Sequence, residues 1–138
     1  MSRRVTFRSR DSDAYFELRD PKLERDGWLS CTAAFGDANG EAIVEFGMIP
    51  HYRQKMIECF EDLAASSLDR WNGVKVWHAE YEHVVVTARS DGSTVGLDVL
   101  IRFAPGDPDR CDETASGTLV IDAARVARAG EEIRSFTA

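Results

Sequence analysis

The fold class is decided by residues 52–101, which read YRQKMIECFEDLAASSLDRWNGVKVWHAEYEHVVVTARSDGSTVGLDVLI. The beginning of this stretch has the apolar spacing of one helix face, with charged residues opposite. The apolar face consists of Tyr52, Met56, Cys59, Phe60 and Leu63. Pro50 suits the first turn of such a helix, because the N–H that proline lacks would have no intrahelical partner there. We expect the helix to end at Trp71 and Asn72-Gly73, since glycine accepts the left-handed backbone that closes many helices.

Strands follow this helix. The β-branched run Val84–Val86 suits a well-covered strand, and we expect that strand to begin before Tyr81. Residues 90–93, Ser-Asp-Gly-Ser, form a turn. Strict alternation of apolar and other residues then follows from Val95 to Phe103, which is typical of a strand with one buried face.

The first third of the chain also alternates with a period of two residues. We predict four antiparallel strands here, over residues 5–7, 14–18, 29–35 and 42–46. Asn39-Gly40 is expected to form a hairpin turn in which both residues adopt positive φ. At the other end of the chain, a strand at Thr118–Ile121 precedes a short helix capped by Asp122.

The order of elements predicts an α+β fold. We expect one predominantly antiparallel, curved sheet of about six to seven strands, with one main helix packed on one face and a short C-terminal helix. The length of 138 residues is close to the commonest size of a domain, so residues 1–138 are predicted to form a single domain.

Composition excludes several classes of partner. The net charge of −7 argues against nucleic acid, which requires clustered Lys and Arg, and the basic N-terminal residues 3–10 are expected to be solvated. No stretch resembles a signal peptide or reaches membrane-spanning length. The cysteines, Cys31, Cys59 and Cys111, are widely spaced and odd in number, which favours reduced thiols and a cytoplasmic location.

Residues that could carry chemistry are sparse. The histidines, His51, His78 and His83, lack the converging spacing of a metal site, and we predict no metal and no cofactor. Two cysteines, Cys31 and Cys59, fall on apolar faces, where a thiol is inert, and Cys111 is expected in an exposed Asp-rich loop that raises its pKa. We predict no catalytic residue.

Two weaker signals concern binding. Glu80 and Glu82 would share one face of a strand, and with Asp98 they could line a carboxylate cavity for a small ligand. Trp28 and Trp77 are candidates for a partner-binding surface, because tryptophan offers a large contact area and one polar group. For Trp77, packing where the helix meets the sheet is the better interpretation.

The order of several motifs resembles a known pattern. These motifs are Phe60–Ala64, Trp71-Asn72-Gly73, Trp77, Val84–Gly92 and Val95–Val99. Together they resemble an uncharacterised family of small bacterial single-domain proteins of unknown function, with a match over about residues 46–103. The resemblance implies a bacterial protein and assigns no catalytic residues.

The leading functional hypothesis is a non-enzymatic cytoplasmic module that binds a protein partner. An immunity-type protein, which neutralises a toxin, is one form of it, because an acidic surface steers a basic partner. The alternative is a small-molecule-binding domain or minor hydrolase that uses the cavity of Glu80, Glu82 and Asp98. A homodimer built through an exposed sheet edge is a third hypothesis.

Overall fold

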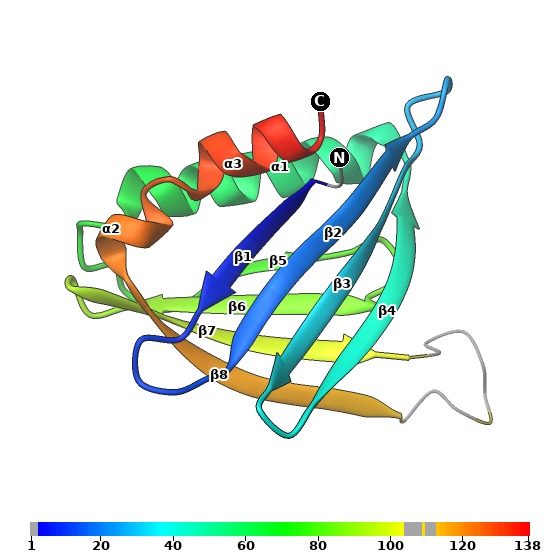
Figure 1. Cartoon of the computed structure of the whole chain (residues 1–138). Helices are drawn as coiled ribbons and strands as arrows, with labels where there is room; N and C mark the ends of the chain where they lie inside the picture. Colours follow the sequence, from blue (N-terminus) through cyan, green and yellow to red (C-terminus); the bar gives the residue numbers. More distant parts are fainter. Residues whose placement is uncertain (1–2, 104–108, 110–112) are drawn as a thin grey trace.

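The computed structural model describes residues 3–103, 109 and 113–138. Strands and helices in these ranges follow one another as shown in Figure 1. They are β1 (Arg4–Arg8), β2 (Tyr15–Leu23), β3 (Leu29–Asp37), β4 (Gly40–Met48), α1 (Pro50–Ser66), β5 (Lys75–His78), β6 (Val84–Ser90), β7 (Thr94–Arg102), β8 (Thr114–Asp122), α2 (Ala123–Val126) and α3 (Ala129–Phe136). The predicted α+β class is confirmed.

The strands form two antiparallel sheets of four strands each, ordered β1-β2-β3-β4 and β5-β6-β7-β8. The prediction of one sheet with about six to seven strands is therefore wrong. Alternation shows which face of a strand is buried, but it does not show which sheet the strand joins. Helix α1 separates the two sets of strands in the chain, so each set pairs only with its own neighbours in sequence.

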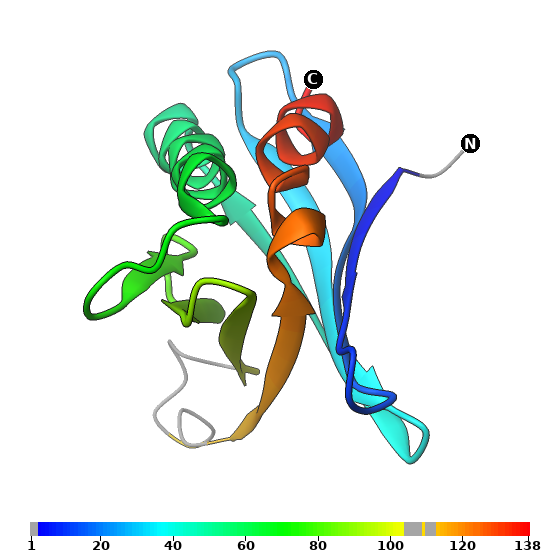
Figure 2. The ribbon, with the colours of Figure 1, turned by 90° about the vertical axis from the view of Figure 1, so that its left-hand side faces the viewer.

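The two sheets are layered with their strands running in different directions, and the helices lie together across one end (Figures 1 and 2). Helix α1 packs on α3 and on β5, and α3 also contacts β1. At the side where β1 and β8 approach each other, the N–H of Arg10 donates to the carbonyl of Val120 at 2.8 Å. The N–H of Val120 in turn donates to Oγ of Ser9 at 3.0 Å. These bonds join the two sheets.

Gly117 of β8 lies at a point where the sheets are in close contact. A Cβ atom built on this glycine would lie 2.4 Å from Cζ of Phe35 in β3. Real Cβ atoms do not approach a ring carbon so closely, because the two atoms would overlap. The absence of a side chain at Gly117 therefore allows the aromatic ring of one sheet to reach the backbone of the other.

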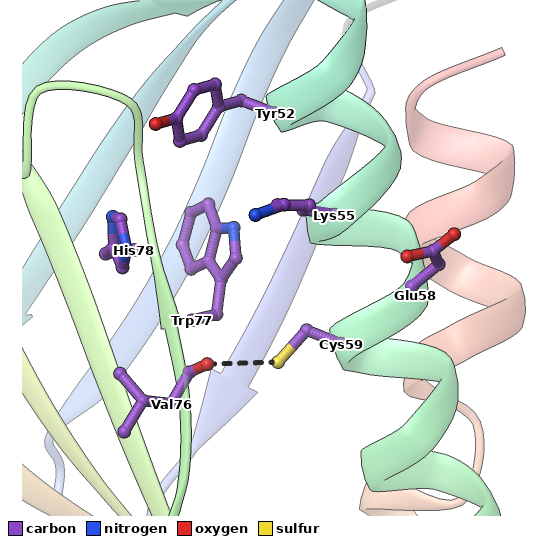
Figure 3. Close-up of a pocket in the computed structure, with 7 residues that line it drawn as sticks. All are labelled: Tyr52, Lys55, Glu58, Cys59, Val76, Trp77 and His78. Carbon is purple, nitrogen blue, oxygen red and sulfur yellow. Dashed lines mark hydrogen bonds between the residues drawn. The ribbon is translucent and has the colours of Figure 1, made fainter.

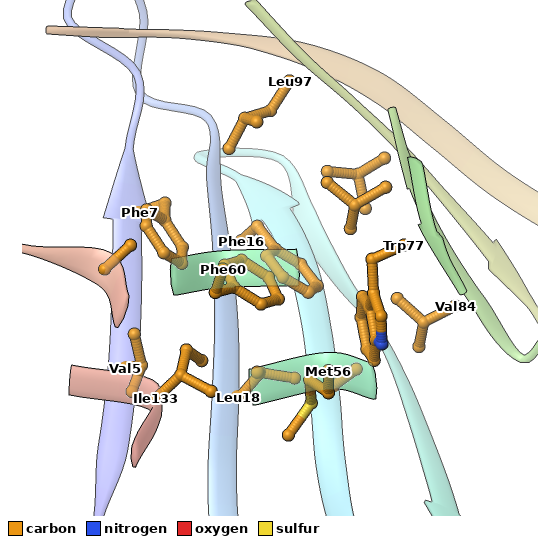
Figure 4. Close-up of a cluster of buried hydrophobic side chains, with 14 of the residues drawn as sticks. Val5, Phe7, Phe16, Leu18, Met56, Phe60, Trp77, Val84, Leu97 and Ile133 are labelled. Carbon is orange, nitrogen blue, oxygen red and sulfur yellow. The ribbon is translucent and has the colours of Figure 1, made fainter. Parts of the chain in front are cut away.

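The core fills the space between the sheets and the helices (Figure 4). Phe60 of α1 lies between the sheets, with ring centroids 6.0 Å from Phe7 of β1 and 5.6 Å from Trp77 of β5. Trp77 also packs against Phe46 of β4 at 6.3 Å. The predicted apolar face of α1 is confirmed at Met56, Phe60 and Leu63, all of which are buried.

Several predicted ends and turns are corrected. Helix α1 ends at Ser66 rather than at Trp71, and β5 ends at His78, so Tyr81 lies in a turn. Gly40 begins β4, and the positive φ expected of Asn39 and Gly40 is not observed.

Side-chain hydrogen bonds explain the turn before β4. The N–H of Asn39 donates to the carboxylate of Asp37 at 2.8 Å, and the N–H of Ala38 donates to that of Asp13 at 3.1 Å. Such bonds stabilise a turn without left-handed residues. At the C-terminus two short helices replace the single predicted one, and Asp122 precedes them without a side-chain capping bond.

We predict that Gly117→Ala destabilises the protein by about 1–3 kcal/mol, because the new methyl group overlaps the Phe35 ring. Urea denaturation would measure the change. Gly96→Ala in β7 is the matched control, since nothing lies within 4 Å of a Cβ atom there. A similar loss of stability in both variants would show that strand glycine itself, and not the contact between sheets, is responsible.

Candidate functional site

A groove lies between α1 and β5 and has a volume of about 390 Å³. Its lining consists of Tyr52, Lys55, Glu58, Cys59, Val76, Trp77 and His78, and Figure 3 shows these side chains. Helix α1 supplies one wall, and the edge of β5 supplies the other. We call this feature the α1–β5 groove.

The β5 wall presents backbone groups that do not pair within the sheet. Strand β5 is the last strand of its sheet, with β6 on one side only. The N–H of Ala79 donates to the carbonyl of Val84 in β6, whereas the carbonyl of Val76 faces α1 and accepts from Sγ of Cys59 at 3.7 Å. Because alternate residues of an antiparallel strand face opposite sides, Val76 and His78 direct their N–H and C=O groups away from β6.

Trp77 contributes a buried hydrogen-bond donor. The side chain is 3% exposed, and its indole nitrogen Nε1 has no acceptor among the described residues. Figure 3 shows this nitrogen on the side of the ring that faces Lys55. A buried donor without an acceptor costs about 1–3 kcal/mol, so this position favours the binding of an acceptor.

The remaining groove side chains make the site rich in donors. Lys55 is exposed, its ammonium lies 5.9 Å from the centre of the Tyr52 ring, and it forms no ion pair with a described residue. Nδ1 of His78 lies 3.0 Å from the carbonyl of Ala79, and its ring packs 6.3 Å from that of Tyr52. The carboxylate of Glu58 accepts from Gln54 at 3.3 Å.

The groove thiol is not suited to nucleophilic catalysis. Burial, assisted by the nearby Asp62 carboxylate, raises the pKa of Cys59 to about 11. Burial also raises the pKa of Cys31, which lies in the core, to about 12. Both thiols are therefore protonated at neutral pH, and a protonated thiol is a poor nucleophile. Cys111 and most of the predicted loop around it lie outside the described residues.

The predicted carboxylates do not come together on one strand face. Glu80 and Glu82 lie in the turn between β5 and β6, where Glu82 has a φ of 57°. The Glu80 carboxylate accepts from the N–H of Ile49 at 3.2 Å, at the start of α1, and Glu82 lies 4.0 Å from Arg102. The expectation that they share one face of a strand is wrong, because the strand ends at His78.

Asp98 lies elsewhere, on the outer face of β7. Its carboxylate accepts from Arg89 at 2.7 Å and from Thr118 at 2.6 Å. It lies four positions along the strand, about 13 Å at the usual rise, from Arg102, the partner of Glu82. The depression beside Asp98, of about 310 Å³, is lined by Val85, Thr87, Asp98, Val99, Leu100, Ser116, Gly117 and Thr118. Ligand binding by these carboxylates stays a prediction.

The two predicted tryptophans occupy different environments. Trp77 belongs to the core and meets the groove only with one edge of its ring. Trp28 is partly exposed and lies over Gly47 of β4, where a Cβ atom would come within 2.4 Å of its ring. Contact of Trp28 with a partner stays a prediction.

A second cluster of charged groups covers the outer face of the first sheet. Arg19 donates to Glu41 at 2.5 Å and to Glu17 at 2.5 Å, and Thr6 also donates to Glu17 at 2.5 Å. Burial alone would raise the pKa of Glu17, which is 4% exposed, but the bonds from Thr6 and Arg19 outweigh it and lower that pKa. These charges neutralise one another, so the cluster stabilises the sheet rather than presenting free groups.

The sequence profile of a family of unknown function, DUF6228, matches residues 7–138. The chain belongs to the DUF6228 family. The resemblance to an uncharacterised family is thus confirmed, and it extends over nearly the whole chain. No curated protein and no solved structure matches the chain.

Membership in DUF6228 assigns no site residue, so the site rests on the geometry described above. Within the described ranges, no three residues of the types His, Cys, Asp and Glu are grouped to hold a metal, and no helix has the length and apolar composition to span a membrane.

Two residues of the groove, Tyr52 and Lys55, are not among the site residues predicted from the sequence. The available signal was Lys55, a lysine three positions after an aromatic residue on the helix, close to the apolar face.

For this DUF6228 protein we predict slow alkylation of Cys59. With a pKa of about 11 instead of the usual 9.0 of a cysteine thiol, the thiolate fraction at neutral pH falls about 100-fold. Iodoacetamide labelling followed by peptide mass spectrometry would measure the rate at this residue, with the unfolded chain as reference. Equal rates for folded and unfolded chains would contradict the protonated thiol.

We also predict that Glu17 stabilises the fold in a pH-dependent way. Its folded-state pKa is lowered, so its contribution is present above the unfolded-state pKa of about 4.3 and is lost as the pH falls through the folded-state value. Glu17→Gln should therefore cost about 1–3 kcal/mol at pH 7 and much less near pH 3.

Urea denaturation at the two pH values would test this, with Glu58→Gln on the exposed face of α1 as control. A cost of Glu17→Gln that is the same at both pH values would show that the charge of Glu17 is not what stabilises the sheet.

Proposed function

We propose that this protein is a non-catalytic binding domain and that its α1–β5 groove receives an extended segment of a protein partner. The observation that carries this proposal is the edge of β5, where Val76 and His78 direct backbone groups away from the sheet and into the groove. An extended peptide can add to such an edge through main-chain hydrogen bonds, and side chains in the groove then give specificity.

The chemistry of the described residues supports binding rather than catalysis. Cys31 and Cys59 have raised pKa values, and the carboxylates Glu17, Glu41 and Asp98 are each held by an arginine. A general base or nucleophile needs a free, suitably ionised group next to the substrate. These three carboxylates and two thiols are instead engaged in structural contacts or buried.

The immunity-type hypothesis is a narrower form of this proposal. It is supported by the net charge of −7, since an acidic surface attracts a basic toxin. The groove itself is consistent with any partner that offers an extended segment.

A small-molecule ligand is the second candidate function. The groove volume of about 390 Å³ lies within the range of ligand sites, near its lower end. This groove is a larger cavity than the depression beside Asp98, so it replaces the predicted carboxylate cavity as the preferred ligand site.

We predict that peptides selected from a random display library on the immobilised protein bind to the groove. Replacing His78 by proline removes a backbone donor at the β5 edge, so His78→Pro should weaken their binding about tenfold. His78→Val is the matched control, because it also removes the imidazole but keeps the N–H. Titration calorimetry with one selected peptide would compare the variants after circular dichroism confirms their folding.

Each result of this experiment has a distinct meaning. Equal binding to the proline and valine variants would contradict recognition of the β5 edge. A library that yields no binder would contradict peptide binding. Sedimentation of the protein alone tests the homodimer hypothesis, because a dimer that is lost in His78→Pro would identify a second copy of the chain as the occupant of the groove.

A further inference from the structure

We propose that the closed end of the α1–β5 groove binds the C-terminal carboxylate of the partner segment, through the indole N–H of Trp77 and the ammonium of Lys55. This inference rests on the proposed function and specifies its ligand chemistry. Three features support it: a buried donor without an acceptor among the described residues, a cation without an ion pair among them, and the shape of the groove.

The first feature is the indole N–H of Trp77. Its ring is fixed by packing against Phe46 and Phe60, so Nε1 keeps one position at the groove. No acceptor among the described residues reaches this nitrogen. An indole nitrogen only donates, so the missing partner must be an acceptor such as a carboxylate oxygen.

The second feature is the positive charge of Lys55. Figure 3 shows its ammonium on the same side of the groove as the indole nitrogen of Trp77. Lys75 forms an ion pair with Asp62 at 2.7 Å, whereas Lys55 has no ion pair with a described residue, and its ammonium lies 5.9 Å from the centre of the Tyr52 ring. A carboxylate would displace the flexible Lys55 side chain slightly and accept bonds from both groups. Charge-assisted bonds of this kind are roughly twice as strong as neutral ones.

The third feature is the shape of the groove. At one end, Sγ of Cys59 meets the carbonyl of Val76 at 3.7 Å, so α1 and β5 are in direct contact there. A chain that runs along β5 from His78 must stop at this contact, and Figure 3 shows Lys55 and Trp77 just before it. The closed end favours a chain terminus, and the two donors favour a carboxylate over an ammonium.

No acidic side chain among the described residues forms an ion pair with Lys55. Glu58 also lines the groove, but in Figure 3 its carboxylate is turned away from Lys55 and Trp77, and it accepts a hydrogen bond from Gln54. Glu80 is held by the N–H of Ile49 at the start of α1. The cation is therefore available to a ligand although the protein as a whole is acidic.

The test follows the indole N–H resonances by nitrogen-15 NMR while the protein is titrated with N-acetylated triglycine that carries a free C-terminus. Trp77→Phe assigns the resonance. The Trp77 signal should shift in a saturable way with the free acid and much less with the C-terminal amide. Acetate, as the carboxylate alone, should give the same direction of shift with at least about tenfold weaker affinity, because it lacks the strand contacts.

Two variants and one internal reference make this test specific. Lys55→Gln should weaken binding of the free acid about fivefold, whereas Lys22→Gln, at an exposed lysine of β2, should leave it unchanged. Trp71 is the internal reference, because its Nε1 is also buried without a partner among the described residues but lies beside Lys75. Its resonance should not move.

The outcomes separate this inference from the proposed function. Equal shifts with acid and amide would overturn the carboxylate site and still support peptide binding in the groove. No Trp77 shift with the acid, or full affinity in Lys55→Gln, would also overturn the carboxylate site, and the display experiment would then judge the groove independently. Equal affinity for acetate and the peptide acid would identify a free carboxylic acid as the ligand in place of a chain end.

Discussion

The packing of Phe60 between Phe7 and Trp77 is the contact on which the rest of the structure depends. The two sheets approach each other closely at Gly117, and α1 packs between β4 and β5 at one end of the layers. Phe60 fills the space between the sheets and fixes the position of α1 relative to each of them. Because α1 is held in this way, one of its faces lies along the edge of β5, and the groove forms there.

The groove also depends on which segments cover the two edges of the second sheet. The segment after β1 covers part of the β8 edge through the hydrogen bonds of Ser9 and Arg10 with Val120. Helix α1 contacts the β5 edge where Cys59 meets Val76, and the groove lies beside this contact. Exposed strand edges promote unwanted pairing, and a strand of only four residues limits that risk. A short edge beside a helix can thus remain open to one specific segment.

Several charged groups on the outer faces of the two sheets are paired with opposite charges. The outer face of the first sheet pairs Arg19 with Glu17 and Glu41, and the outer face of the second pairs Arg89 with Asp98. Lys55 differs from these groups because it forms no ion pair with a described residue, and its ammonium lies 5.9 Å from the centre of the Tyr52 ring. A cation and an indole N–H that line one groove, each without a charged or accepting partner among the described residues, make a local site for an anion, even in a protein with a net charge of −7.

The sequence by itself determined the local structure: the helix from Pro50, the turn at residues 90–93 and the buried faces of β3, β4 and β7 follow from apolar periodicity and turn chemistry. Only the tertiary structure decided that the strands divide into two sheets, that β5 stops at His78, and that Glu80, Glu82 and Asp98 lie apart. It also placed Lys55 and Trp77 together, although 22 positions separate them in the chain. The physical reason is that periodicity reports which side of each element is buried, whereas the partner of that side is chosen by packing between distant segments.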